Sequence, residues 1–172
     1  KPDTLRLHLE NCLTLLEATA NRHDLSALWL ALVDALHPLP LRWGFWSPWL
    51  DVLQRAADKA AELGRPAMRA RYLAHMATLL LDTAQAGAAL RRASEALGEA
   101  GRAGDGYALA LAGSRMAGAL SALGRYDEAR ELLVEVRYQL DALPTGASGL
   151  PEVPGYALLD MEQMDLARQD GR

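Results

Sequence analysis

The sequence predicts an all-α protein, folded as an α-solenoid of antiparallel helix pairs with a period of about 40 residues. The first observation behind this fold class is composition. Among 172 residues there are 34 leucines and 32 alanines, but no isoleucine, five valines and six threonines. Because strands draw on β-branched and aromatic side chains, so small a supply excludes a sheet with a facing layer.

The second and third observations are two features that recur at a fixed spacing. Residues that interrupt or begin helices lie 40 positions apart: Asp24, Gly64, Gly104 and Pro144. Leucine and methionine positions follow the same spacing: Met76 with Met116, Leu80 with Leu120, and Leu13 with Leu53 and Leu133. A helix pair repeated in this way buries its apolar face by stacking on its neighbours, which is the signature of a solenoid.

The first half of the chain is expected to hold a leading helix and one helix pair. Apolar residues at three- and four-residue spacing predict the leading helix over 4–21. The pair 24–63 starts with Asp24 as the N-cap of its first helix, which ends before Pro38. Its second helix opens at Ser47-Pro48, a capping residue followed by proline in the first turn.

The second half is expected to hold two more pairs, 66–103 and 106–142, which complete a repeat domain over residues 1–143. Alanines at Ala89 and Ala129 are predicted where paired helices approach closely, because a longer side chain there would hold the backbones apart.

The remaining residues, 144–172, are expected to form a Pro/Gly linker and a C-terminal helix that caps the open end of the stack. Helical spacing marks this helix, with Leu158, Met161 and Met164, or Leu159 and Met164, on one face. Two alternatives stay open: the helix begins another repeat, or it docks into a groove of this or another copy. Open solenoid ends would also allow a homo-oligomer.

Charge and cysteine content narrow the function classes. The net charge of −4 gives no support for direct nucleic-acid binding, which uses a clearly basic face. A single cysteine, Cys12, excludes an intrachain disulfide, and no apolar run approaches the ~20 residues of a membrane span. We therefore expect a cytoplasmic protein without a membrane partner. Sixteen arginines against two lysines favour a bacterial source, and the start at Lys1 suggests a piece of a larger protein.

Residues 107–142 resemble the tetratricopeptide repeat. The matching positions are Met116-Ala117, Leu120, Gly124, Tyr126, Ala129, Leu133 and Val136. Residues 67–102 match less closely, since Ala84 and Ala86 stand where glycine and an aromatic residue are usual. The long period is similar to the C-terminal repeat arrays of bacterial STAND-type signal-transduction ATPases and transcription regulators. This resemblance implies a right-handed superhelix that senses a ligand or a partner for a larger regulator.

The resemblance also implies which residues face a ligand. First helices line the inner face of such a superhelix, and the ligand-facing positions carry over to Asp34, Arg71, Thr78, Asp82, Ser114, Gly118 and Ser121. Small residues would let the backbone of a partner approach, and Arg71 could bind a carboxylate with two hydrogen bonds. The alternative is that these positions form an ordinary solvated helix face.

An aromatic segment, residues 43–49, is a second candidate site. It contains three of the four tryptophans and the only phenylalanine. Trp46 and Trp49 occupy expected core positions, whereas Trp43 and Phe45 have no place in the repeat. Trp43 and Phe45 are therefore candidates for stacking on a ligand or a partner.

Catalysis and metal binding have no support in the sequence. There is no Gly-rich phosphate loop, no nucleophile elbow and no paired-histidine metal motif. His8 and Cys12 are one helical turn apart, but no motif supplies a third ligand. We expect no cofactor and no metal. The predicted function is a non-catalytic interaction or sensor module with a protein or peptide partner, or with other domains of the same polypeptide. The alternative is a small-ligand sensor that uses the segment 43–49 or the inner groove.

Overall fold

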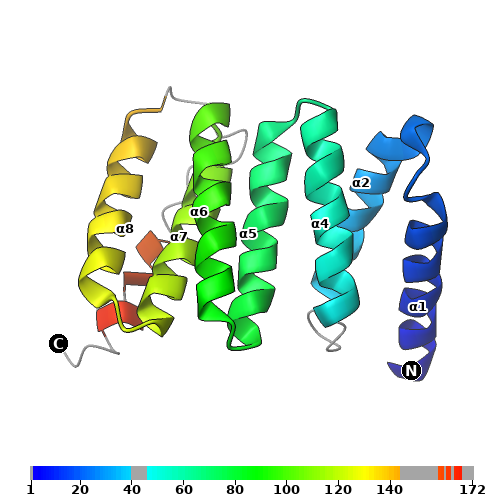
Figure 1. The fold of residues 1–172 in the computed structure, drawn as a ribbon, viewed down its shortest axis with the longest axis horizontal. Helices are drawn as coiled ribbons and strands as arrows, with labels where there is room; N and C mark the ends of the chain where they lie inside the picture. The colour runs from blue at the N-terminus through cyan, green and yellow to red at the C-terminus, as the bar shows by residue number, and fades with distance from the viewer. Residues whose placement is uncertain (1, 40–45, 144–158, 161, 164, 168–172) are drawn as a thin grey trace.

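A computed structural model of the chain describes residues 2–39, 46–143, 159–160, 162–163 and 165–167. These residues form a row of helices, which confirms the predicted all-α class for this part of the chain (Figure 1). The elements are α1 (Pro2–Thr19), η1 (His23–Leu25), α2 (Ser26–Leu36), α4 (Trp46–Glu62), α5 (Pro66–Asp82), α6 (Ala86–Ala103), α7 (Gly106–Ala122) and α8 (Tyr126–Asp141). None of the described helices is long and apolar enough to cross a bilayer.

The helices pack in chain order. From α4 to α8 each helix contacts the next, and α5 also contacts α7, the second helix along. In Figure 1 the row runs from α1 at one end to α8 at the other. One face of the row is therefore shared by helices that are not neighbours in sequence.

Four of the helices are followed by a residue whose backbone lies in the left-handed region. Positive φ occurs at Gly64, Ala84, Gly104 and Gly124, each 20 residues after the one before it. After three of them a backbone N–H reaches back to a carbonyl five residues earlier: Arg65 to Ala60 at 2.8 Å, Gln85 to Leu80 at 2.7 Å and Arg125 to Leu120 at 2.9 Å. This C-terminal motif satisfies carbonyls that the helix leaves free and turns the chain into the next helix.

One predicted helix start agrees with the structure, and two differ. Pro66 opens α5, as predicted. The N-cap predicted at Ser47 is wrong, because α4 begins one residue earlier, at Trp46, so Ser47 lies inside the helix. A cap that was not predicted occurs at Asp105, which accepts a hydrogen bond from the backbone N–H of Ala108 at 2.7 Å at the start of α7.

The prediction that Asp24 caps the following helix is wrong, because Asp24 lies inside η1. Its carboxylate instead accepts two hydrogen bonds from Arg22, and α2 begins at Ser26 without a side-chain cap.

Apolar residues from successive helices form the core. Trp49 is fully buried, as predicted, and lies in one cluster with Leu16, Trp29 and Tyr72. Trp46 differs from its predicted core position, because 36 % of it is exposed. It is the first residue of α4, and helical side chains lean toward the N-terminus, so no earlier turn of its own helix lies beneath it.

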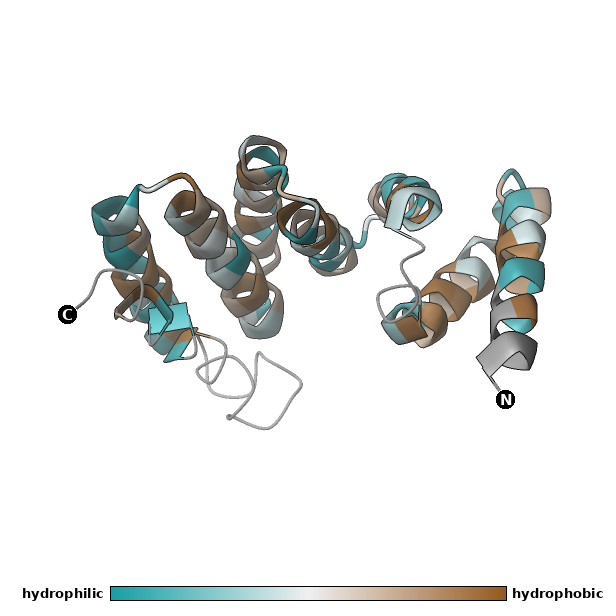
Figure 2. Ribbon diagram, turned by 90° about the horizontal axis from the view of Figure 1, so that it is seen from below, coloured by the Kyte–Doolittle hydropathy of each residue, from teal (hydrophilic) through white to brown (hydrophobic). Residues whose placement is uncertain are grey.

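The described C-terminal residues pack against the last two helices. Leu159 and Leu166 are buried and share a cluster with Ala117, Leu133 and Val136. Figure 2 places these residues to one side of the helix row, near the α8 end. The whole of the predicted linker, 144–155, lies outside the described residues, as do Leu158, Met161 and Met164.

Candidate functional site

The predicted ligand-facing residues lie on three helices. Asp34 is on α2, Arg71, Thr78 and Asp82 are on α5, and Ser114, Gly118 and Ser121 are on α7. Two of the α5 residues join no cluster: the Thr78 hydroxyl donates to its own helix at Ala74 O, 3.2 Å away, and Asp82 is exposed at the end of α5. Trp43 and Phe45 lie outside the described residues.

Asp34 and Arg71 meet at a buried tyrosine. Tyr72 is 2 % exposed, and its hydroxyl lies 3.5 Å from the Leu30 carbonyl. Burial raises the pKa of the Tyr72 phenol far above its usual range, and a hydrogen bond with Asp34 adds to this shift. The charge of Arg71 acts in the opposite direction. The structure therefore joins two predicted residues from different helices around one side chain.

Two histidines continue this face. The rings of His37 and His75 have centroids 3.8 Å apart, and Trp49 Nε1 donates to His37 Nδ1 at 3.1 Å. His37 is thus neutral with its proton on Nε2. Burial, His37 and the positive charges of Arg115 and Arg71 lower the pKa of His75 to about 3. Burial also lowers the pKa of His37, and the negative charge of Asp34 opposes only part of this shift.

The α7 end of the face meets the C-terminal residues. A methyl group built on Gly118 would lie 3.2 Å from Glu162 Oε1. Burial raises the pKa of Glu162, while the charge of Arg115 opposes the shift. Ser114 and Ser121 are 2 % and 6 % exposed and lie on the same stripe of α7 as Gly118. These three predicted residues are therefore partly or fully covered rather than open to solvent.

We name these groups the inner polar strip: Asp34, His37, Arg71, His75, Arg115 and Glu162. Sequence reasoning found Asp34 and Arg71 but missed the other four. One signal could have found two of them, because His75 on α5 and Arg115 on α7 lie 40 positions apart, the period that the sequence predicts. The contact of His37 with His75 had no such signal, since these residues lie 38 positions apart.

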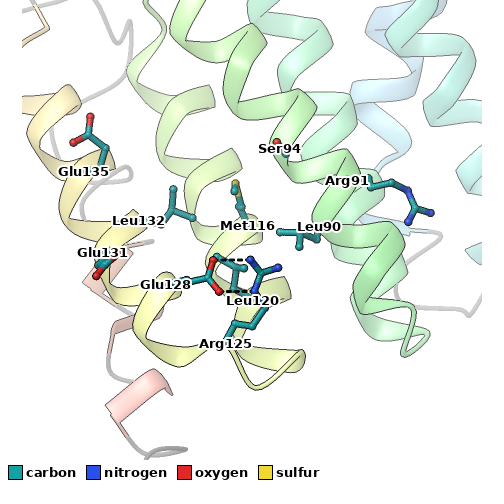
Figure 3. Close-up of a pocket in the computed structure, with 10 residues that line it drawn as sticks. All are labelled: Leu90, Arg91, Ser94, Met116, Leu120, Arg125, Glu128, Glu131, Leu132 and Glu135. Atoms are coloured by element: carbon teal, nitrogen blue, oxygen red, sulfur yellow. Dashed lines mark hydrogen bonds and ion pairs between the residues drawn. The ribbon is translucent and has the colours of Figure 1, made fainter.

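Two further grooves, which the sequence did not indicate, lie between helices that are two apart in the row. The larger runs between α6 and α8 over α7 and has a volume of about 690 Å³ (Figure 3). Its lining residues are Leu90, Arg91, Ser94, Met116, Leu120, Arg125, Glu128, Glu131, Leu132 and Glu135. Figure 3 shows Leu90, Met116, Leu120 and Leu132 at the centre and the glutamates of α8 along one edge.

The second groove has a lining similar to that of the first and lies two helices earlier in the row. It lies between α4 and α6 over α5 and has a volume of about 600 Å³. Its lining residues are Leu50, Asp51, Gln54, Met76, Leu80, Ala88, Arg91, Arg92 and Glu95. Each of them stands 40 positions before a residue that lines the larger groove. The apolar floor is kept between the two, whereas the charged edges differ.

The aromatic segment borders a smaller cavity. Ser47 and Pro48, together with Trp29 and Leu16, line a space of about 240 Å³, which is below the 300–1,000 Å³ typical of small-molecule sites. Of the two residues weighed as metal ligands, His8 is exposed and Cys12 is half-buried. No group of three or more His, Cys, Asp or Glu that could hold a metal occurs among the described residues.

The inner polar strip is the candidate recognition surface, because it joins Asp34 and Arg71 with a second half-buried arginine, Arg115, although Asp34 itself is exposed. A half-buried guanidinium is partly removed from water and so can bind a carboxylate more strongly than an exposed one. Compared with protein-family models, curated proteins and solved structures, the chain has no match.

Proposed function

We propose that the chain is a non-catalytic interaction module of a larger bacterial regulatory protein. In this proposal it is a tetratricopeptide-like α-solenoid, and its inner polar strip binds a protein or peptide partner. The partner belongs to another protein or to another domain of the same polypeptide. Arg71 and Arg115 are the proposed ligands for partner carboxylates, because a guanidinium binds a carboxylate with two parallel hydrogen bonds.

The observation that carries the proposal is the correspondence between the two grooves. All nine residues that line the smaller groove have a counterpart 40 positions later in the larger one. Evenly spaced left-handed turns and the contact of α5 with α7 support the same repeat. Stacked helix pairs of this kind create extended surfaces, and recognition of a partner is the use such surfaces favour.

The state of the arginines supports the choice of the strip. Arg115 Nε is buried and has no hydrogen-bond partner within the described part of the chain. Arg71 is half-buried, and the adjacent His75 is neutral at physiological pH because of its low pKa. A carboxylate from a partner would therefore meet two positive charges without a competing imidazolium.

The small-ligand alternative has less support. The described cavity beside Ser47 and Pro48 has a volume of only about 240 Å³. The two larger grooves are edged by charged side chains on both sides. A flat apolar ligand would have to desolvate those charges on entry, which costs free energy.

A peptide selection tests the proposal. Random peptides displayed on phage would be selected on the full chain, and enriched peptides would be synthesised for fluorescence anisotropy. We expect enriched peptides to contain acidic residues and to lose about tenfold or more in affinity when Arg71→Ala or Arg115→Ala removes a charged hydrogen bond.

The matched control is Arg91→Ala, since Arg91 is exposed and lines both grooves on the other side of the row. Peptides should bind this variant as they bind the wild type. Loss of binding in Arg91→Ala alone would move the site to the grooves and contradict the proposal, as would the failure of any peptide to be enriched.

A further inference from the structure

The described C-terminal residues already occupy part of the inner face. Leu159 and Leu166 are 0 % and 1 % exposed and join the cluster that contains Ala117 and Leu133. Their spacing corresponds to two turns of a helix, and the described residues between them have helical geometry. A helical segment thus presents two leucines to α7 and α8.

Polar contacts hold the same segment on basic residues. Asp160 forms an ion pair with Arg137 of α8. Glu162 lies over Gly118 and is close enough to Arg115 of α7 for that charge to lower its pKa against the effect of burial. Residues 145–172 contain five acidic residues and two arginines. The segment is acidic, and the side chains that receive its carboxylates are basic.

The segment covers a place where the sequence predicted contact with a ligand. Gly118 lies beneath Glu162. Because glycine has no side chain, the Glu162 carboxylate can lie 3.2 Å from the place where a Cβ atom of residue 118 would be. Leu81 of α5 lies 3.6 Å from the same position, so Glu162 sits near the line between α5 and α7. The occupied surface is therefore continuous with the half of the strip that contains Arg71 and His75.

We propose that the α7–α8 face binds an acidic amphipathic helix of a partner protein, and that residues 159–167 are an intramolecular stand-in which that helix displaces. The partner helix has two apolar residues seven positions apart and carboxylates that meet Arg115 and Arg137. This inference rests on the proposed function and names the class of its partner. A partner helix that extends toward α5 also reaches Arg71, a contact that would favour the partner over the stand-in.

Competition from the chain's own segment has a measurable consequence. The apparent affinity for a partner is reduced by the fraction of molecules in which the face is free. Because a tethered segment acts at a high effective concentration, the face is occupied most of the time in the absence of a partner. Undocking the segment should therefore increase the affinity for an acidic helix.

A labelled peptide with the sequence of residues 156–172 is the probe, and fluorescence anisotropy on the full chain is the measurement. We expect the full-length variant Leu159→Asp/Leu166→Asp to bind the peptide at least about tenfold more tightly than the wild type, because its own segment no longer competes. Gln163→Asp is the matched control, since Gln163 is an exposed residue of the same segment. This control should bind the peptide as the wild type does.

A milder variant keeps the test valid if the double variant does not fold. Asp160→Asn changes only the tail residue and removes the negative charge that pairs with Arg137. It should increase peptide affinity by about twofold to fivefold, in line with the small worth of an exposed ion pair. A peptide that itself lacks the two leucines should not bind any of the proteins.

Four results would overturn the inference. Equal binding of the peptide to all full-length proteins, or binding to none of them, would mean that the segment does not compete for a binding surface. A dimer of the wild type in sedimentation velocity that dissociates in the double variant would assign the face to a second copy. Enrichment of basic rather than acidic peptides on the double variant would contradict the partner class.

Failure of the proposed function gives a different pattern. The Arg71→Ala variant would then bind selected peptides normally, while the probe of residues 156–172 would still compete with the segment on Arg115 and Arg137.

Discussion

Gly113 on α7 lies directly against Val136 on α8. A methyl group built on Gly113 would lie 2.8 Å from Val136 Cγ2 and 2.9 Å from Cγ1, distances that real Cβ atoms do not adopt. Forty positions earlier stand Leu73 on α5 and Ala96 on α6, both buried. The larger side chain of the two thus lies on α5 in one case and on α8 in the other, with a small residue on the facing helix each time.

Gly113→Ala should lower the free energy of unfolding. Alanine in a helix interior is favoured over glycine by about 0.5–1 kcal/mol, but overpacking against Val136 costs about 1–3 kcal/mol. The clash should win, and urea denaturation would measure the loss. The matched control is Gly98→Ala on α6, where nothing lies within 4 Å of the added methyl; it should gain about 0.5–1 kcal/mol. Stabilisation by both substitutions would contradict the close contact.

Ala84→Gly should stabilise the protein. Ala84 has φ of 58°, in the left-handed region that glycine occupies at the other three turns. An L-residue there costs about 1–2 kcal/mol, and the greater freedom of glycine in the unfolded chain returns only part of this. We expect a net gain of about 0.5–1 kcal/mol by thermal and urea denaturation. Gly124→Ala, with φ of 74°, is the converse experiment and should destabilise; a gain there would refute the reasoning.

Arg69→Ala should be one of the more damaging charge deletions on α5. Arg69 pairs with Glu95 at 2.6 Å and with Glu99, whose side chain is only 8 % exposed. Leaving a buried carboxylate short of a partner costs about 1–3 kcal/mol; Arg102 limits the loss because it also pairs with Glu99, at 2.9 Å. Arg102→Ala removes a 71 % exposed side chain and should cost less than about 1 kcal/mol. Equal losses in denaturation would contradict this ranking.

His75 should make stability fall as the pH is lowered. Its pKa in the folded protein is about 3 because of burial and nearby positive charge, against 6.5 for a free imidazole. Between these values the unfolded state therefore binds more protons than the folded state. The stability that the neutral His75 contributes is complete above pH 6.5, and below that pH the free energy of unfolding decreases by up to about 1.4 kcal/mol per pH unit.

The measurement is urea denaturation between pH 6.5 and 5, above the range where most carboxylates titrate. His75→Gln should show a clearly shallower decrease than the wild type, with the remainder due partly to His37, whose pKa is also lowered. His8→Gln changes an exposed histidine and should keep the wild-type slope. An unchanged slope in His75→Gln would mean that the folded protein takes up the proton.

Local features of the fold were readable from the sequence. Gly64, Gly104 and Gly124 mark the ends of α4, α6 and α7, because a left-handed turn depends on the residue that adopts it. The cap of α7 by Asp105 was not predicted, but it also depends on a bond within the first helical turn. The predicted N-cap at Asp24 was wrong because the Asp24 carboxylate accepts its hydrogen bonds from the neighbouring Arg22 instead of from the helix backbone. Residue preference alone does not show which of these two donors binds the carboxylate.

The sequence by itself therefore determined the all-α class and most helix bounds, since helices, caps and turns depend on residues close in the chain. Only the tertiary structure decided that the rings of His37 and His75 lie against each other, that Val136 packs directly on Gly113, and that Glu162 lies over Gly118. These contacts join residues that are far apart in the chain and lie on different elements. Their existence depends on the angles and separations at which helices pack, and these follow from the combined volumes of many side chains.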